Sequence, residues 1–194
     1  MRRRLLILAA AAGLSGCAAL NTVHSDIRTY GEWPSGRAPG SYAFDRLPSQ
    51  QSNPQATELL EQAARPALQK AGFVEAGPGQ APDVTVQVAA RITRTDIDLW
   101  TDPLWWRGGF GIHRRPWVGT GWSLGLRADF PRYDREVAVL IRDAATSKPL
   151  YEARASHEGT SSGGHGLTQA LFEAALIDFP RTGINPRTVV VTLP

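Results

Sequence analysis

Apolar and polar residues alternate with a period of two along several segments of the chain. Over 83–92, valine, alanine and isoleucine occupy every second position, and most of the positions between them are polar. This alternation is typical of a β-strand with one buried face. Two more strands are predicted at 136–142 and 150–158, around a turn at 143–149. The inward residues of the two strands are expected to face one another across the hairpin. They are Val137, Val139 and Ile141 on the first strand and Tyr151, Ala153 and Ala155 on the second. Shorter strands are predicted at 41–46, 73–75 and 188–193.

Two segments have the spacing of helices with one buried face, 54–71 and 167–177. Asn53 is the expected N-cap of the first helix, Gly72 is expected to end it, and Pro66 inside it is expected to bend it. The order of helices and strands predicts an α+β fold, a two-layer sandwich with two helices packed on one face of a mostly antiparallel sheet.

The N-terminus has the organisation of a secretion signal. Arg2, Arg3 and Arg4 precede a short apolar run, which is followed by Leu-Ser-Gly-Cys ending at Cys17. The run is shorter than the roughly 20 residues that a membrane span needs. Leu-Ser-Gly-Cys resembles the bacterial lipobox, which implies that residues 1–16 are removed and that the Cys17 thiol receives diacylglycerol. Ala18 is similar to the residue found there in outer-membrane lipoproteins.

The remainder divides into a tether and a domain. Residues 17–40 are expected to form the lipidated tether and linker, because 31–41 is rich in glycine, proline and serine and alternation across 22–30 is weak. Residues 41–194 are expected to form a single α+β domain with an insert at 99–135.

Charge and sulfur content narrow the functional classes. The 194 residues contain 21 Lys and Arg against 18 Asp and Glu, and loss of the three N-terminal arginines leaves 18 against 18. This balance argues against nucleic acid as a partner. The only cysteine is Cys17, so neither thiol catalysis nor a disulfide is expected, and no cofactor is predicted.

The insert at 99–135 is the least ordinary segment. It holds five of the six tryptophans of the chain, interleaved with glycines and accompanied by several arginines. Tryptophan and arginine together suit a membrane interface, a stacked sugar such as peptidoglycan, or a protein interface. Packing of the tryptophans over the sheet as core is the alternative. The candidate binding residues are Trp100, Trp105, Trp106, Arg107, Arg114, Arg115, Trp117 and Trp122.

Catalytic and metal motifs are incomplete. Two segments match Gly-x-Ser-x-Gly, around Ser123 and Ser161, and His157 or His165 would have to act as the base. His157, Glu158 and His165 are also the best candidate metal cluster, although the close helical histidine pair of a zinc site is missing. Carboxylates at 96, 98 and 102 could act as acid and base, or simply face solvent.

Four short segments carry a resemblance to a known family. They are Ala71-Gly72-Phe73, Pro82-Asp83-Val84, the Asp143…Thr146…Leu150 hairpin and Phe179-Pro180. Together they resemble the bacterial lipoproteins called domain of unknown function 4136, over roughly residues 41–180. Ser147 and Tyr151 depart from the glycine and tryptophan usual in that hairpin. The resemblance implies an envelope lipoprotein without an established activity.

These observations predict an outer-membrane lipoprotein that faces the periplasm and is anchored through Cys17. Its expected role is non-enzymatic binding or envelope maintenance through the insert. The expected partners are the membrane, reached through the lipid, and an envelope protein or peptidoglycan. The alternative is a small periplasmic serine hydrolase that uses Ser123 or Ser161.

Overall fold

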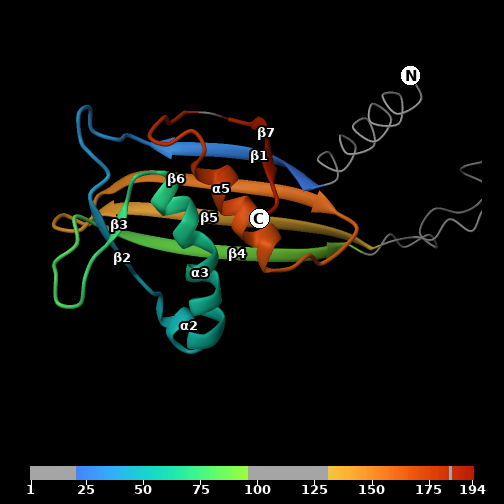
Figure 1. Ribbon diagram of the computed structural model, residues 1–194, viewed down its shortest axis with the longest axis horizontal. Coiled ribbons are helices and arrows are strands. Elements are labelled where there is room, and N and C mark those ends of the chain that lie inside the picture. The colour runs from blue at the N-terminus through green and yellow to red at the C-terminus, as the bar shows by residue number, and fades with distance from the viewer. Residues whose placement is uncertain (1–20, 96–130, 184) are drawn as a thin grey trace, which may run out of the picture.

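The computed structural model describes residues 21–95, 131–183 and 185–194. Within them the chain forms one seven-stranded sheet and three helices (Figure 1). The strands are β1 (Thr22–Gly31), β2 (Ser41–Phe44), β3 (Val74–Glu75), β4 (Val84–Thr95), β5 (Arg132–Asp143), β6 (Pro149–Gly159) and β7 (Arg187–Thr192). The helices are α2 (Pro48–Gln51), α3 (Pro54–Lys70) and α5 (His165–Leu176).

The strand order is β3-β2-β4-β5-β6-β1-β7. β2 runs parallel to β3 and β4, and every other neighbouring pair is antiparallel. The predicted facing of the hairpin strands is confirmed, because the register pairs Val137 with Ala155, Val139 with Ala153 and Ile141 with Tyr151. The sheet and its helices confirm the predicted α+β sandwich.

Helices α3 and α5 lie on the same face of the sheet (Figure 1). Asn53 caps α3 as predicted, since its side chain accepts a hydrogen bond from the Ala56 N–H. α5 packs on β5, β6, β1 and β7 and also against α3. Being covered by both the sheet and α3 explains why six of its residues, Ala170–Phe172 and Ala174–Leu176, are buried. The short helix α2 was not predicted.

Strand β1 corrects the predicted tether. Residues 22–31 lie inside the sheet, paired with β6 on one side and β7 on the other, and so belong to the domain. The inward positions of β1 are Val23, Ser25, Ile27 and Thr29, all buried. Since two of these four are polar, the hydropathy pattern lost its period of two although the burial pattern kept it.

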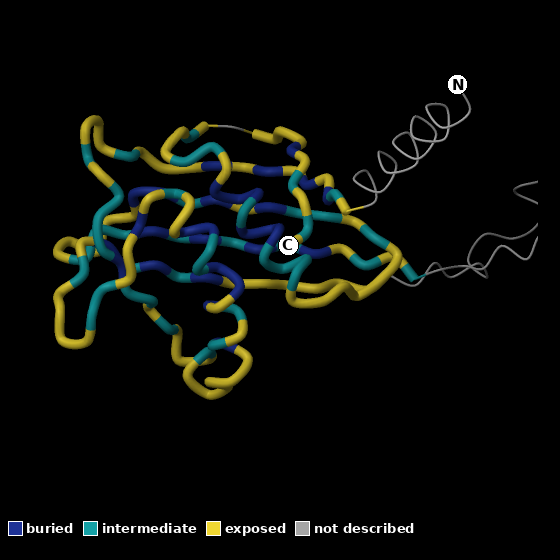
Figure 2. The backbone as a smooth tube through the Cα atoms, viewed as in Figure 1, coloured by how far each residue is buried: buried dark blue, intermediate teal, exposed yellow. Residues whose placement is uncertain are grey.

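The strands also run further than predicted. β4 extends to Thr95 and β5 begins at Arg132, so the insert is shorter than 99–135 at its second boundary. Ala90 and Ile92 were expected to be buried with the valines before them, but both are exposed, Ile92 to 58%. The valines of β4 are covered as far as Val88, and the strand continues beyond that cover (Figure 2).

The sheet has two distinct ends. At one, here called the tether end, β1 begins, β4 stops, β5 begins and β6 stops (Figure 1). At the other, the hairpin end, β1 stops, β4 begins and the turn at 144–148 joins β5 to β6. The segment before β1 and both ends of the insert therefore join the sheet at the tether end.

The hairpin end is closed by aromatic packing. Trp33 makes edge contacts with Phe73 and Phe179, at centroid separations of 5.9 and 4.8 Å, and Phe179 also meets Tyr151 at 5.1 Å. An Arg37–Asp143 ion pair of 2.8 Å ties the segment after β1 to the hairpin. The stretch 32–40, predicted to be a linker, is thus held against the core by side-chain contacts.

Candidate functional site

One face of the sheet is left uncovered by the described helices, and it is polar. Because the register aligns alternate residues across strands, one row on this face runs through Thr188, Asp26, Ser156, Glu136 and Arg91. These five residues come from five different strands. Strand pairing thus brings together side chains that are up to 162 positions apart in the sequence.

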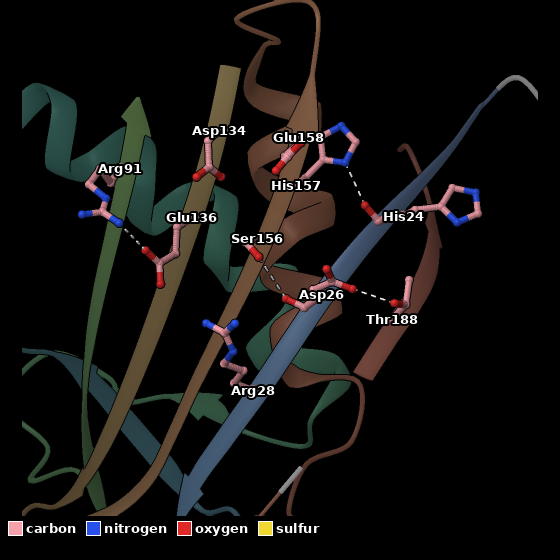
Figure 3. Close-up of a pocket in the computed structure, with 10 residues that line it drawn as sticks. All are labelled: His24, Asp26, Arg28, Arg91, Asp134, Glu136, Ser156, His157, Glu158 and Thr188. Carbon is pink, nitrogen blue, oxygen red and sulfur yellow. Dashed lines mark hydrogen bonds and ion pairs between the residues drawn. The ribbon is translucent and has the colours of Figure 1, made fainter. Parts of the chain in front are cut away.

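This face is hollowed toward the tether end (Figure 3). The hollow has a volume of about 880 Å³. Ten residues line it, namely His24, Asp26, Arg28, Arg91, Asp134, Glu136, Ser156, His157, Glu158 and Thr188. All ten have polar or charged side chains, which makes the hollow unlike a pocket for an apolar small molecule.

Several lining groups are held in place by hydrogen bonds (Figure 3). Glu136 receives a bond of 2.9 Å from Arg91, and Arg154 approaches its other oxygen at 3.8 Å. Thr188 donates a 2.6 Å bond to the Asp26 carboxylate. Two carboxylates of the hollow therefore have a fixed orientation.

The histidine pair is linked through the backbone. His157 Nδ1 lies 2.8 Å from the carbonyl oxygen of His24. Because a carbonyl oxygen can only accept, Nδ1 must carry the proton of this bond. The Nε2 atom of a neutral His157 is consequently left as a hydrogen-bond acceptor.

Other lining groups remain available to a ligand. Arg28 and Asp134 form no ion pair within the described ranges, and both are exposed. The hollow as a whole carries four carboxylates and two guanidinium groups, so its charge is net negative when the histidines are neutral. This arrangement can hydrogen-bond hydroxyl groups and attract ammonium groups, and Arg28 can receive a carboxylate.

The predicted binding residues fall elsewhere in the chain. Cys17 lies outside the described residues, and so do Trp100, Trp105, Trp106, Arg107, Arg114, Arg115, Trp117 and Trp122. Ser123 and the carboxylates at 96, 98 and 102 also lie outside them. The predictions for these positions stay predictions.

The second hydrolase motif is described, and its parts are separate. Ser161 lies exposed in the loop before α5, and His165 is the first residue of that helix. Within the described ranges no serine hydroxyl is hydrogen-bonded to a histidine, and His157 is bonded to the His24 carbonyl instead. No group of three or more metal-ligating side chains forms in the same part of the chain.

The sequence analysis missed the hollow because no local motif marks it. Most of its residues occupy alternate polar positions on β1, β4, β5, β6 and β7, which a single sequence presents as ordinary solvent-facing positions. Recognising β1 as a strand would have been a signal, since Asp26 joins the row, and Arg28 the hollow, only through β1.

The architecture defines a class of protein, an α+β sandwich with one covered and one uncovered sheet face. The sequence matches the family described as Domain of unknown function (DUF4136) over residues 27–181. The chain belongs to this family, and the match includes much of β1. Comparison with curated proteins finds no match.

Two solved structures are similar to this chain at low sequence identity. A PDZ domain protein from Parabacteroides distasonis is 12% identical, with a TM-score of 0.50 over 94% of this chain and 42% of that chain. This chain thus spans less than half of that protein's length. The PelC dodecamer from Paraburkholderia phytofirmans is 13% identical, with a TM-score of 0.43 over 78% of this chain and 95% of that chain. Among the described residues, no helix is both long and apolar enough to cross a membrane.

Proposed function

We propose that this protein is a lipoprotein of the outer membrane that faces the periplasm and binds peptidoglycan through the polar hollow. The observation that carries the proposal is the hollow itself, a concave polar surface on the uncovered sheet face beside the tether end. Binding rather than catalysis is proposed because the lining groups are arranged as donors and acceptors across five strands.

The chemistry of the hollow suits peptidoglycan. Its glycan strand offers hydroxyl groups to the carboxylates, which accept strong hydrogen bonds. Its stem peptide carries both ammonium and carboxylate groups, which match Asp134 and Arg28 respectively.

The proposed anchor places the hollow near the membrane. Cys17 precedes the start of β1 by five residues, which span at most roughly 18 Å when fully extended. A lipid on Cys17 would hold the start of β1 within that distance of the bilayer surface, and both ends of the insert leave the sheet at the same end, from β4 and β5. The Trp/Gly/Arg insert is accordingly proposed to contact the membrane interface or an envelope partner there.

The anchor is tested by Cys17→Ala. We expect wild type to incorporate a palmitate analogue and to fractionate with the outer membrane, and the variant to do neither. Membrane association of Cys17→Ala, together with an unlabelled wild type, would contradict the lipoprotein proposal.

The hollow is tested by sedimentation with purified sacculi in detergent. We expect wild type to sediment and the Asp26→Asn/Glu136→Gln double variant to bind at least about five-fold more weakly. Each change removes a carboxylate acceptor that its hydrogen bond from Thr188 or Arg91 holds in position for the ligand. The matched control is Glu32→Gln, an exposed carboxylate outside the hollow. Failure of wild type to sediment, or equal loss in Glu32→Gln, would contradict the proposal.

The hydrolase alternative has its own test. A fluorophosphonate probe labels an activated serine, and Ser161→Ala and Ser123→Ala report which residue is labelled. We expect no labelling. Labelling that either substitution abolishes would replace the binding proposal by the hydrolase.

A further inference from the structure

Arg135 is a buried charge without a counter-charge. It lies on the face of β5 that packs toward α5, opposite the hollow, and only 4% of it is exposed. Its Nη2 donates a 3.1 Å hydrogen bond to the carbonyl oxygen of Ser161, whereas Nε has no partner. No carboxylate in the described ranges forms an ion pair with it.

The other buried charged side chain among the described residues, Glu61, has an ion-pair partner. Glu61 is 2% exposed and receives bonds of 2.7 and 2.6 Å from Arg46. A buried ion that lacks such a partner is strongly destabilising. Burial accordingly lowers the pKa of the Arg135 guanidinium.

A second positive feature meets Arg135 at the same place. The loop that holds Ser161 leads directly into α5, a helix of 12 residues. Its N-cap is Gly164, which offers no side-chain cap, and its first turn contains no acidic residue. The first N–H groups of α5 are therefore free donors at the positive end of a helix.

Gly163 packs directly against the guanidinium. A Cβ at this position would collide with Nη1 of Arg135, and the backbone φ of +56° is itself one that side-chain-bearing residues rarely adopt. The whole stretch 160–165 is exposed, so the loop side is open to solvent. A buried cation, helix N–H groups without a side-chain cap and an exposed loop of small residues thus meet at the same place.

We propose that this point, formed by Arg135, the 160–164 loop and the N-terminus of α5, binds the phosphate group of a small molecule or of a lipid headgroup. Guanidinium and helix N–H groups are the donors that oxyanions select. The bound anion supplies the charge that Arg135 lacks. The site lies on the helix side of β5 and is independent of the hollow and of peptidoglycan binding.

The test is a titration of the full chain with phosphate in non-ionic detergent. Binding is monitored through the NMR signals of the backbone amides of residues 164–167. Chloride at equal ionic strength is the reference. A second arm replaces inorganic phosphate by phosphatidylglycerol mixed into the micelles. We expect these amides to shift in at least one arm; a shift in the first alone indicates a soluble ligand, and in the second alone a lipid headgroup.

Variants assign the binding to the proposed donors. Arg135→Gln should weaken phosphate affinity at least about ten-fold, and Gly163→Ala should do the same while keeping the guanidinium. Arg181→Gln, which removes an exposed arginine elsewhere, should change nothing. Unshifted amides in both arms of wild type would overturn the proposal, whether or not the variants fold. Equal affinity in wild type and Arg135→Gln would also overturn it.

Discussion

The two ends of the sheet differ in how completely their charged groups are partnered. At the hairpin end, charged groups are paired, as Arg37 is with Asp143, and aromatic rings fill the space between the 32–40 stretch and the core. At the tether end Arg132 pairs with Glu158 at 3.3 Å, but Asp134 is exposed and forms no ion pair within the described part of the chain, and Arg135 is buried without a counter-charge.

We infer from this difference that the hairpin end mainly stabilises the fold and that the tether end mainly binds ligands. Groups that satisfy one another stabilise the folded state and bind a ligand only through the hydrogen-bonding capacity they have left, as the Asp26 and Glu136 carboxylates are proposed to do. Groups left unsatisfied cost stability, and proteins retain them mainly where they bind something. The hairpin end is therefore expected to govern unfolding, and the tether end to govern binding.

The largest effect is expected from Phe73→Ala. Phe73 is 2% exposed and packs against Trp33 and Phe179, so its removal should lower the free energy of unfolding by about 3–5 kcal/mol. Ile92→Ala, near the tether end, should cost less than about 1 kcal/mol because Ile92 is mostly exposed. Denaturant midpoints measure both, and a similar cost for the two would remove the contrast.

A smaller loss is expected from Gly31→Ala at the hairpin end. Gly31 has φ +100°, and a Cβ there would lie 2.7 Å from the Leu150 carbonyl oxygen. We expect about 1–3 kcal/mol of destabilisation from strain and displacement of β6. Gly79→Ala is the matched control, since Gly79 has φ +78° but open space around it. Equal losses would show that the β6 contact contributes nothing.

Unfolding by acid should depend on the Arg37–Asp143 ion pair at the hairpin end. The hydrogen bond from Arg37, with those from Thr146, lowers the pKa of Asp143 to about 2. A folded-state pKa below the unfolded value adds stability above about pH 4, which is lost as the pH falls toward 2. Asp143→Asn should therefore be less stable at neutral pH and lose less between pH 4 and 2. Acid unfolding curves of identical slope for variant and wild type would contradict this.

The smallest effect on stability is expected from Glu136→Gln in the hollow. Its partner Arg91 is 73% exposed, so the pair should contribute less than about 1 kcal/mol. Thermal unfolding of the variant should nearly match wild type while sedimentation with sacculi falls. A large loss of stability would instead make Glu136 a structural residue.

The sequence predicted those parts of the fold in which hydropathy follows geometry. β4, β5 and β6 were predicted because their inward residues are mainly valine, isoleucine and alanine. β1 was not, because Ser25 and Thr29 are buried polar residues within it. The hollow was unpredictable for a related reason, since the pairing of β1 with β6 and β7 decides which polar residues become neighbours.

The burial of Arg135 could not be predicted from the sequence either. Its position in the sequence, among charged residues at 132–136, is typical of an exposed strand end. Only its alternation with Val137 and Val139 places it on the covered face, and that requires β5 to begin at Arg132 rather than at 136. A boundary shift of four residues thus hid the buried charge.

The central claim is that the tether end faces the membrane and the hairpin end faces away. Since Cys17 is the only cysteine and the proposed lipid occupies it, single probes can be attached through Glu158→Cys at the tether end and Lys148→Cys at the hairpin end. In vesicles containing lipid-borne quenchers, we expect strong quenching of the probe at 158 and little at 148. Equal quenching, or stronger quenching at 148, would contradict it.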